Sequence, residues 1–108
     1  MIVYGIPTCE TVKKALAALK AAGRSPVFHD VRADPLDDAT WKRFEAAFGE
    51  RLVNRGSTTW RKLSQAERAQ PMLTLLKANP TLMKRPVIEG GGTLTLGWTK
   101  EVQGHYLK

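Results

Sequence analysis

The chain has 108 residues, 43% of them hydrophobic, and its 17 Lys and Arg against 10 Asp and Glu give a formal net charge of +7. A 12.0 kDa chain can bury about two-thirds of its surface in one core, so we expect a single domain over residues 1–108. No apolar run approaches the ~20 residues of a membrane-spanning helix and no secretion signal is evident, so we expect neither membrane insertion nor export. The one cysteine, Cys9, excludes an internal disulfide and a multi-cysteine metal site, and it favours a cytoplasmic location.

The basic residues are spread along the chain. They occur as the separate pairs 13–14, 61–62 and 84–85, with no basic run of five and no alternation with aromatic residues. Nucleic-acid binding is therefore not expected. A solvated basic surface or a local anion pocket accounts better for the charge.

The first part of the chain predicts a strand, a helix and a second strand. Residues 2–4 are β-branched or aromatic and stop at Gly5, which indicates a short buried strand. Apolar residues at spacings of three and four from 12 to 22 predict a helix that ends at Gly23. Residues 26–31 predict the second strand, and two parallel strands joined in this way need a right-handed crossover.

The middle of the chain is helical in pattern. Asp37 or Asp38 can cap a helix that ends at Gly49, and three aromatic residues of that helix are expected in the core: Trp41, Phe44 and Phe48. Residues 54–63 begin as a polar loop and close in a helical turn.

A further helical segment follows this loop. Ser64 and Glu67 have the spacing of a capping box at a helix start. Pro71 should interrupt or restart that helix, and Pro80 marks its end.

The last part predicts a hairpin and a helix. Residues 86–89 and 93–96 are strand-like and flank the glycine turn 90–92, and residues 98–107 can form a final helix. The complete order favours a thioredoxin-like three-layer α/β fold, with a four-stranded mixed sheet and a helical insert over roughly residues 37–80.

Cys9 lies where the first strand leads into the first helix. Unpaired backbone N–H groups and the helix dipole favour a thiolate there, and Lys13 and Lys14 add positive charge. A thiolate is the form that a nucleophilic or redox cysteine needs. The alternative is a small buried hydrophobic residue, although the polar neighbours of Cys9 argue against burial.

No second cysteine is available to resolve a mixed disulfide, because Val12 occupies the place of the second Cys in a Cys-Xaa-Xaa-Cys pair. An external thiol must do this, and glutathione is the obvious small candidate. Glutathione is anionic, so arginines could hold it: Arg55, Arg61 and Arg85 are the candidates. Arg85 is favoured because a cis bond to Pro86 would place the backbone beside the loop of Cys9, and an ordinary trans turn is the alternative.

Three segments of the sequence resemble one family. YGIPTCETVKKA at residues 4–15, NRGSTTWRKL at 54–63 and KRPVI at 84–88 are similar, in order and spacing, to the ArsC/Spx family, and most of all to its YffB-like branch. The match runs over almost the whole chain.

The resemblance implies a thioredoxin-like core with a helical insert and a nucleophile at Cys9. It also implies an anion-binding Arg85 before a cis Pro86, and a contribution from Arg55. Thr8 and Thr11, which flank the cysteine, are further candidates for substrate or anion binding. YffB-like members are taken to be glutathione-dependent thiol reductases with no bound cofactor, and glutaredoxin assists the family's arsenate reductases.

Two departures from the family's arsenate reductases matter. Glu10 places a carboxylate next to the nucleophile, and the segment Leu96-Gly97-Trp98 stands where those enzymes have an arginine after the hairpin. Both changes weaken binding of a multiply charged oxyanion, so arsenate reduction is the second expectation rather than the first.

A different class of function also remains open. The family includes Spx-type regulators that bind RNA polymerase, and those with a redox switch use the cysteine pair that Val12 breaks. His29 and His105 lack neighbouring ligands in the sequence, so we expect no bound metal.

Overall fold

The computed structural model describes residues 1–107, and these residues fall into two compact units. The first unit consists of Met1–Asp30 together with the chain from Arg85 onward, and the second is Val31–Lys84. Among the described helices, none is long and apolar enough to cross a membrane.

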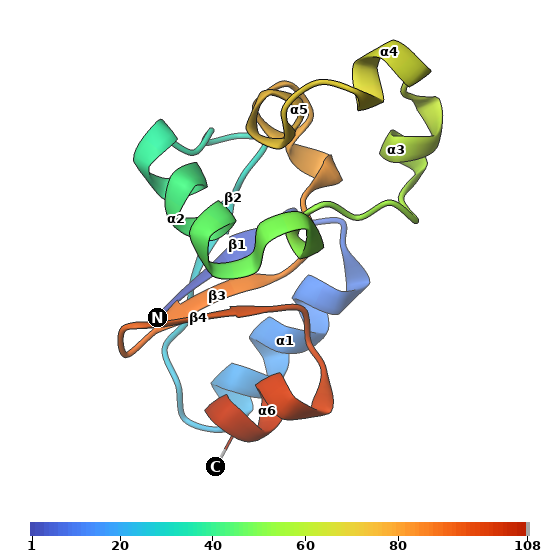
Figure 1. The fold of residues 1–108 in the computed structure, drawn as a ribbon. Coiled ribbons are helices and arrows are strands. Elements are labelled where there is room, and N and C mark those ends of the chain that lie inside the picture. The colour runs from blue at the N-terminus through green and yellow to red at the C-terminus, as the bar shows by residue number, and fades with distance from the viewer. Residues whose placement is uncertain (108) are drawn as a thin grey trace. The chain divides into compact units, whose positions relative to one another are not determined.

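The first unit contains the sheet (Figure 1). Its strands are β1 (Ile2–Gly5), β2 (Val27–Asp30), β3 (Val87–Gly90) and β4 (Thr93–Leu96), in the order β2-β1-β3-β4. β1 and β2 are parallel, whereas β3 is antiparallel to both β1 and β4. The expected α/β fold with a four-stranded mixed sheet is confirmed.

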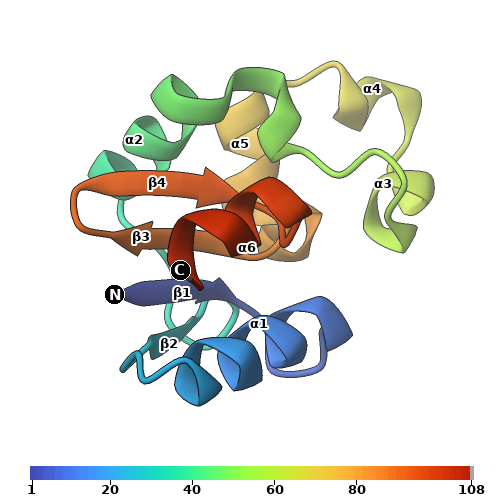
Figure 2. The same cartoon turned by 90° about the horizontal axis from the view of Figure 1, so that it is seen from below.

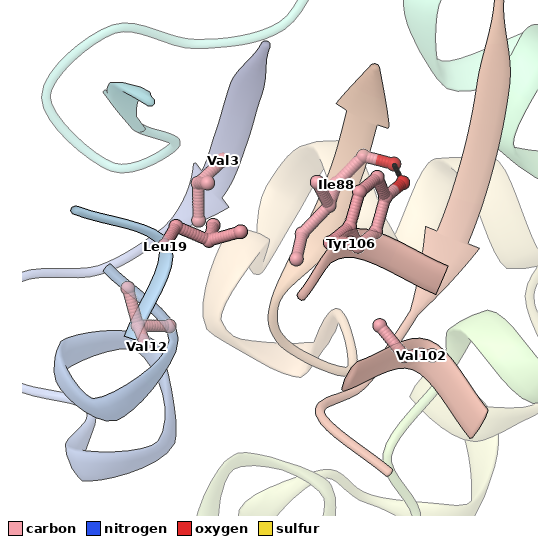
Figure 3. Packing of buried hydrophobic residues seen from close by; sticks show 6 residues of the cluster. All are labelled: Val3, Val12, Leu19, Ile88, Val102 and Tyr106. Carbon is pink, nitrogen blue, oxygen red and sulfur yellow. Dashed lines mark hydrogen bonds between the residues drawn. The ribbon is translucent and has the colours of Figure 1, made fainter. Parts of the chain in front are cut away.

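Two helices of the first unit cover the same face of this sheet (Figure 2). They are α1 (Glu10–Ala21), which follows β1, and α6 (Lys100–Tyr106), which follows β4. The apolar spacing predicted for the first helix places its buried side chains toward the strands. Figure 3 shows the resulting core, which brings together residues from β1, α1, β3 and α6: Val3, Val12, Leu19, Ile88, Val102 and Tyr106.

Glycine is needed at two places in the first unit, one for close packing and one for the backbone angles of a turn. A Cβ at Gly5 would lie 2.6 Å from Cγ2 of Val12, so glycine lets α1 pack closely against the end of β1. Gly91 and Gly92 have φ of 58° and 79°, which suits the two-residue turn between β3 and β4.

The second unit is made of short helices joined by loops. Three of its aromatic residues, Trp41, Phe44 and Phe48, are buried, as predicted. The elements are α2 (Asp38–Phe48), η1 (Gly49–Leu52), α3 (Thr58–Lys62), α4 (Gln65–Arg68), α5 (Met72–Ala78) and η2 (Pro80–Leu82).

Local capping explains where these helices begin. Asp37, rather than Asp38, is the N-cap of α2, and its Oδ1 accepts from Thr40 N at 2.8 Å. The capping box at α4 is confirmed, since Glu67 N donates to Ser64 Oγ at 3.1 Å and Ser64 N donates to Glu67 Oε1 at 2.9 Å.

Two helix boundaries differ from the sequence prediction. α1 begins at Glu10 instead of residue 12, because its first turn is polar and gives no apolar signal. α6 begins at Lys100 instead of residue 98, because Thr99 is its N-cap and accepts from Val102 N at 3.2 Å.

Candidate active site

Three segments of the first unit meet at one end of the sheet. Tyr4 of β1 pairs with Val87 of β3, so the end of β1 lies beside the start of β3. Gly97, just after β4, donates its N–H to the carbonyl of Pro86 at 2.8 Å. The loop that carries Cys9 continues from this end of β1, so it lies at the same end of the sheet as Pro86.

Cys9 is the N-cap residue of α1 and has extended backbone angles of φ −82° and ψ 118°. Its carbonyl accepts from Lys13 N at 3.1 Å, and its own N–H donates to the carbonyl of Ile6 at 3.3 Å. No side chain caps this helix start. The sulfur therefore belongs to the residue from which a 12-residue helix begins, where first-turn N–H groups and the dipole favour negative charge.

The Cys9 side chain is half-buried and packs against the core of the first unit. It is thus neither a fully buried core residue nor a fully exposed one. A partly exposed cysteine at a helix start is the arrangement that reactive cysteines share.

The charges near Cys9 are already partly paired. Lys13 Nζ lies 3.3 Å from Glu10 Oε1, and both side chains are largely exposed. The charges of Lys13 and Glu10 therefore offset one another, whereas the sequence prediction counted Lys13 as support for the thiolate and Glu10 as a charge that weakens oxyanion binding. Their spacing of three residues on a helix is the signal that could have predicted this pair. Lys14 is exposed on the same helix.

The other predicted residues at this end of the sheet differ in exposure. Thr8 and Thr11 are exposed, Arg85 is half-buried and Pro86 is buried. The Arg85–Pro86 peptide bond is cis. Arg85 and Cys9 thus belong to the same unit and to the same end of its sheet.

Arg55 and Arg61 belong to the second unit. Arg55 Nη2 lies 3.9 Å from Glu50 Oε2, and its guanidinium lies 5.8 Å from the ring centroid of Trp60. Arg61 is exposed on α3. Within this unit Arg55 is thus held by an acidic and an aromatic neighbour.

The loop of Arg55 is ordered by its own side chains. Asn54 Oδ1 accepts from Gly56 N at 3.1 Å, and Ser57 Oγ donates to Asn54 O at 2.7 Å. Ser57 is also the N-cap of α3, since its Oγ accepts from Trp60 N at 3.1 Å. The polar run at residues 54–57 therefore leads directly into the predicted helical turn.

The two histidines lie against aromatic rings. The ring centroid of His29 is 5.1 Å from that of Tyr4, and that of His105 is 4.7 Å from that of Tyr106. Over residues 1–107 there is no group of three or more His, Cys, Asp and Glu side chains that could hold a metal ion.

The match to known proteins covers nearly the whole chain. The ArsC family model matches residues 4–104. An uncharacterized protein from Haemophilus influenzae is 41% identical over 110 residues, which is 96% of each chain.

Solved structures of similar proteins also match nearly the whole chain. A protein named YFFB is 34% identical with a TM-score of 0.91, and the match covers 99% of this chain and 98% of that one. An arsenate reductase (ArsC) related protein from Brucella melitensis is 37% identical with a TM-score of 0.75, over 99% and 93% of the two chains. The chain therefore belongs to the ArsC family, in its YffB-like branch, and has the thioredoxin-like fold of that family.

Proposed function

We propose that this protein is a glutathione-dependent thiol/disulfide oxidoreductase with Cys9 as its single nucleophile. The observation that carries the proposal is the position of the one cysteine, half-buried at the uncapped start of α1. Reactive cysteines share this position at a helix start, and a cysteine sulfur is the nucleophile in thiol–disulfide exchange.

The proposed reaction has two exchange steps. In the first, the Cys9 thiolate attacks the glutathione sulfur of a mixed disulfide between glutathione and a substrate thiol. The substrate leaves as a thiolate, and Cys9 becomes joined to glutathione. In the second, the thiolate of a free glutathione attacks the glutathione sulfur of that adduct, which releases oxidised glutathione and restores the Cys9 thiolate. Glutathione supplies the reducing electrons, and one proton from its thiol leaves with the products.

The need for an external thiol follows from the residue that a resolving cysteine would occupy. Position 12 is Val, and its side chain is fully buried in the core of the first unit. An external thiol must therefore resolve the adduct, and we propose glutathione or a glutaredoxin for this step. Arg85 is the arginine that we propose to hold a glutathione carboxylate, because it lies at the same end of the sheet as Cys9. Thr8 and Thr11, which flank Cys9, are proposed as further contacts, whereas Arg55 and Arg61 belong to the second unit and stay predictions from the sequence.

Arsenate reduction has weaker support. The residue after β4 is Gly97 rather than an arginine, and Glu10 adjoins the nucleophile. The Lys13 contact offsets part of the Glu10 charge but adds no net positive charge for a multiply charged anion.

The test is turnover of a mixed disulfide between glutathione and a short peptide, with reduced glutathione as the reductant. We expect the protein to accelerate release of the peptide thiol and the Cys9→Ser variant to lose the acceleration. A control reaction without reduced glutathione should stop after one equivalent of peptide thiol. Equal rates for the two proteins would contradict the proposal. Co-purification with RNA polymerase instead would favour a regulator of the Spx type.

A further inference from the structure

A pocket lies at the opposite end of the first unit's sheet from Cys9. β1 begins at Ile2 beside Glu89 of β3, and the pocket lies beyond this end, against the turn that joins β3 to β4. Its volume is about 320 Å³, which is within the range of small-molecule sites. The residues that line it come from the N-terminus, the segment after α1, the β3–β4 hairpin around its turn, and α6.

Arg24 lies in this pocket and is held in place at two points. Gly23 N donates to Lys20 O at 3.0 Å and Arg24 N donates to Leu19 O at 2.9 Å, which is the Schellman pattern of a helix end. The Nε of Arg24 donates to Tyr106 O at 3.2 Å. Because both its backbone and its Nε are held, the guanidinium is oriented before any ligand arrives.

Among residues 1–107, no acceptor is found for the two terminal nitrogens of Arg24. An arginine fork of this kind matches the oxygens of a phosphate or carboxylate group.

The other lining groups complement an anion that carries an organic part. His105 and Thr93 add an imidazole and a hydroxyl, and none of the described lining residues is Asp or Glu. Met1 gives the pocket an apolar side, with its methyl group against Gly90, whereas Tyr106 is 2% exposed and offers little surface to a ligand. A phosphate group has three terminal oxygens, so Arg24, His105 and Thr93 could each contact one of them. A carboxylate has only two oxygens.

We propose that this pocket binds a small organic phosphate, with its phosphate group on Arg24, His105 and Thr93 and its organic part against Met1. This site is separate from the proposed oxidoreductase site, because it lies at the other end of the sheet and contains no cysteine. A test of this pocket is therefore independent of the function proposed for Cys9.

The test is a titration followed by amide NMR shifts, with phenyl phosphate, inorganic phosphate and benzoate as separate probes. We expect phenyl phosphate to give saturable shifts at Gly91, Thr93 and His105 and to bind more tightly than either other probe. The Arg24→Gln variant should weaken that binding about tenfold or more, because it removes charge-assisted hydrogen bonds. His105→Ala should also weaken it, whereas the control Arg51→Gln, with the same change of charge, should not.

Three results would overturn the proposal. The first is binding of phenyl phosphate to Arg24→Gln as tight as to Arg51→Gln. The second is binding of benzoate or inorganic phosphate as tight as that of phenyl phosphate, and the third is a cluster of shifts at the Cys9 end of the sheet. Unchanged binding by the Cys9→Ser variant is expected, since that residue lies outside the pocket.

Discussion

The hydroxyl of Tyr106 donates to the backbone carbonyl of Ile88 at 3.3 Å and so joins the last helix to the central part of the sheet (Figure 3). The same oxygen accepts from Thr95 Oγ1 at 3.0 Å, so α6 is tied to β3 and β4 at one point. Tyr106 is almost fully buried. Burial disfavours the phenolate and raises the pKa of Tyr106, while the Thr95 hydrogen bond and the charge of Arg24 act in the opposite direction.

We therefore expect the protein to lose stability at alkaline pH through Tyr106. Because the pKa of Tyr106 is raised on folding, the folded state holds this proton more tightly than the unfolded state does. The contribution is fully present below about pH 10 and is lost as the pH rises through the raised pKa. Urea unfolding at a series of alkaline pH values would measure it.

The Tyr106→Phe variant is the control for this titration. It removes the hydroxyl and should cost about 1 kcal/mol at neutral pH, because two hydrogen bonds are lost. Its stability should fall less steeply above about pH 10 than that of the parent. Parallel curves for the two proteins would show that Tyr106 is not the group responsible.

Acid should destabilise the second unit through its helix caps and one ion pair. Hydrogen bonding to Thr40 lowers the pKa of Asp37, and the contact with Lys77 at 2.7 Å lowers that of Asp38. Groups with lowered pKa stabilise the fold above their unfolded pKa of about 4, and this contribution is lost as the pH falls through the lowered value. Melting temperatures between about pH 2 and pH 6 should therefore fall toward acid, and less so for Asp37→Ala. An equal acid dependence in that variant would contradict the role given to the cap.

Two glycine substitutions should have opposite effects. Gly5→Ala places a Cβ 2.6 Å from a methyl group of Val12 and should destabilise the protein by about 1–3 kcal/mol. Gly104→Ala, within α6, meets nothing within 4 Å and should stabilise it by up to about 1 kcal/mol. Urea unfolding of both variants checks the pair, and equal shifts would refute the close packing inferred at Gly5.

Arg85→Ala should weaken glutathione binding while leaving the fold intact. Loss of one charge-assisted hydrogen bond corresponds to about 1.5–3 kcal/mol of binding free energy. Calorimetric titration with reduced glutathione would measure it, with Arg51→Ala as the control for loss of one positive charge. Unchanged affinity in Arg85→Ala would remove this residue from the proposed site.

Much of the fold could be predicted because its signals are local. The capping box at Ser64 depends on residues three positions apart, and the hairpin depends on consecutive glycines. The start of α1 could not be located from apolar periodicity, because Glu10 and Thr11 are polar and exposed.

Of the two proposed sites, one could be predicted from the sequence and the other could not. Cys9 was predictable because it lies between a strand and a helix that both have clear patterns. The Arg24 pocket was not, because Arg24 and Tyr106 are 82 residues apart and meet only when the hairpin returns α6 to the face that α1 covers. No spacing in the sequence signals that contact.

The central claim is that Cys9 is an activated nucleophile that glutathione can both modify and release. Intact-protein mass spectrometry after incubation with oxidised glutathione tests it most directly, because Cys9 is the only cysteine in the chain. The account predicts one glutathione per chain, formed faster than on a free cysteine peptide at neutral pH and removed by reduced glutathione. An adduct that forms no faster than on the peptide, or no adduct at all, would contradict it.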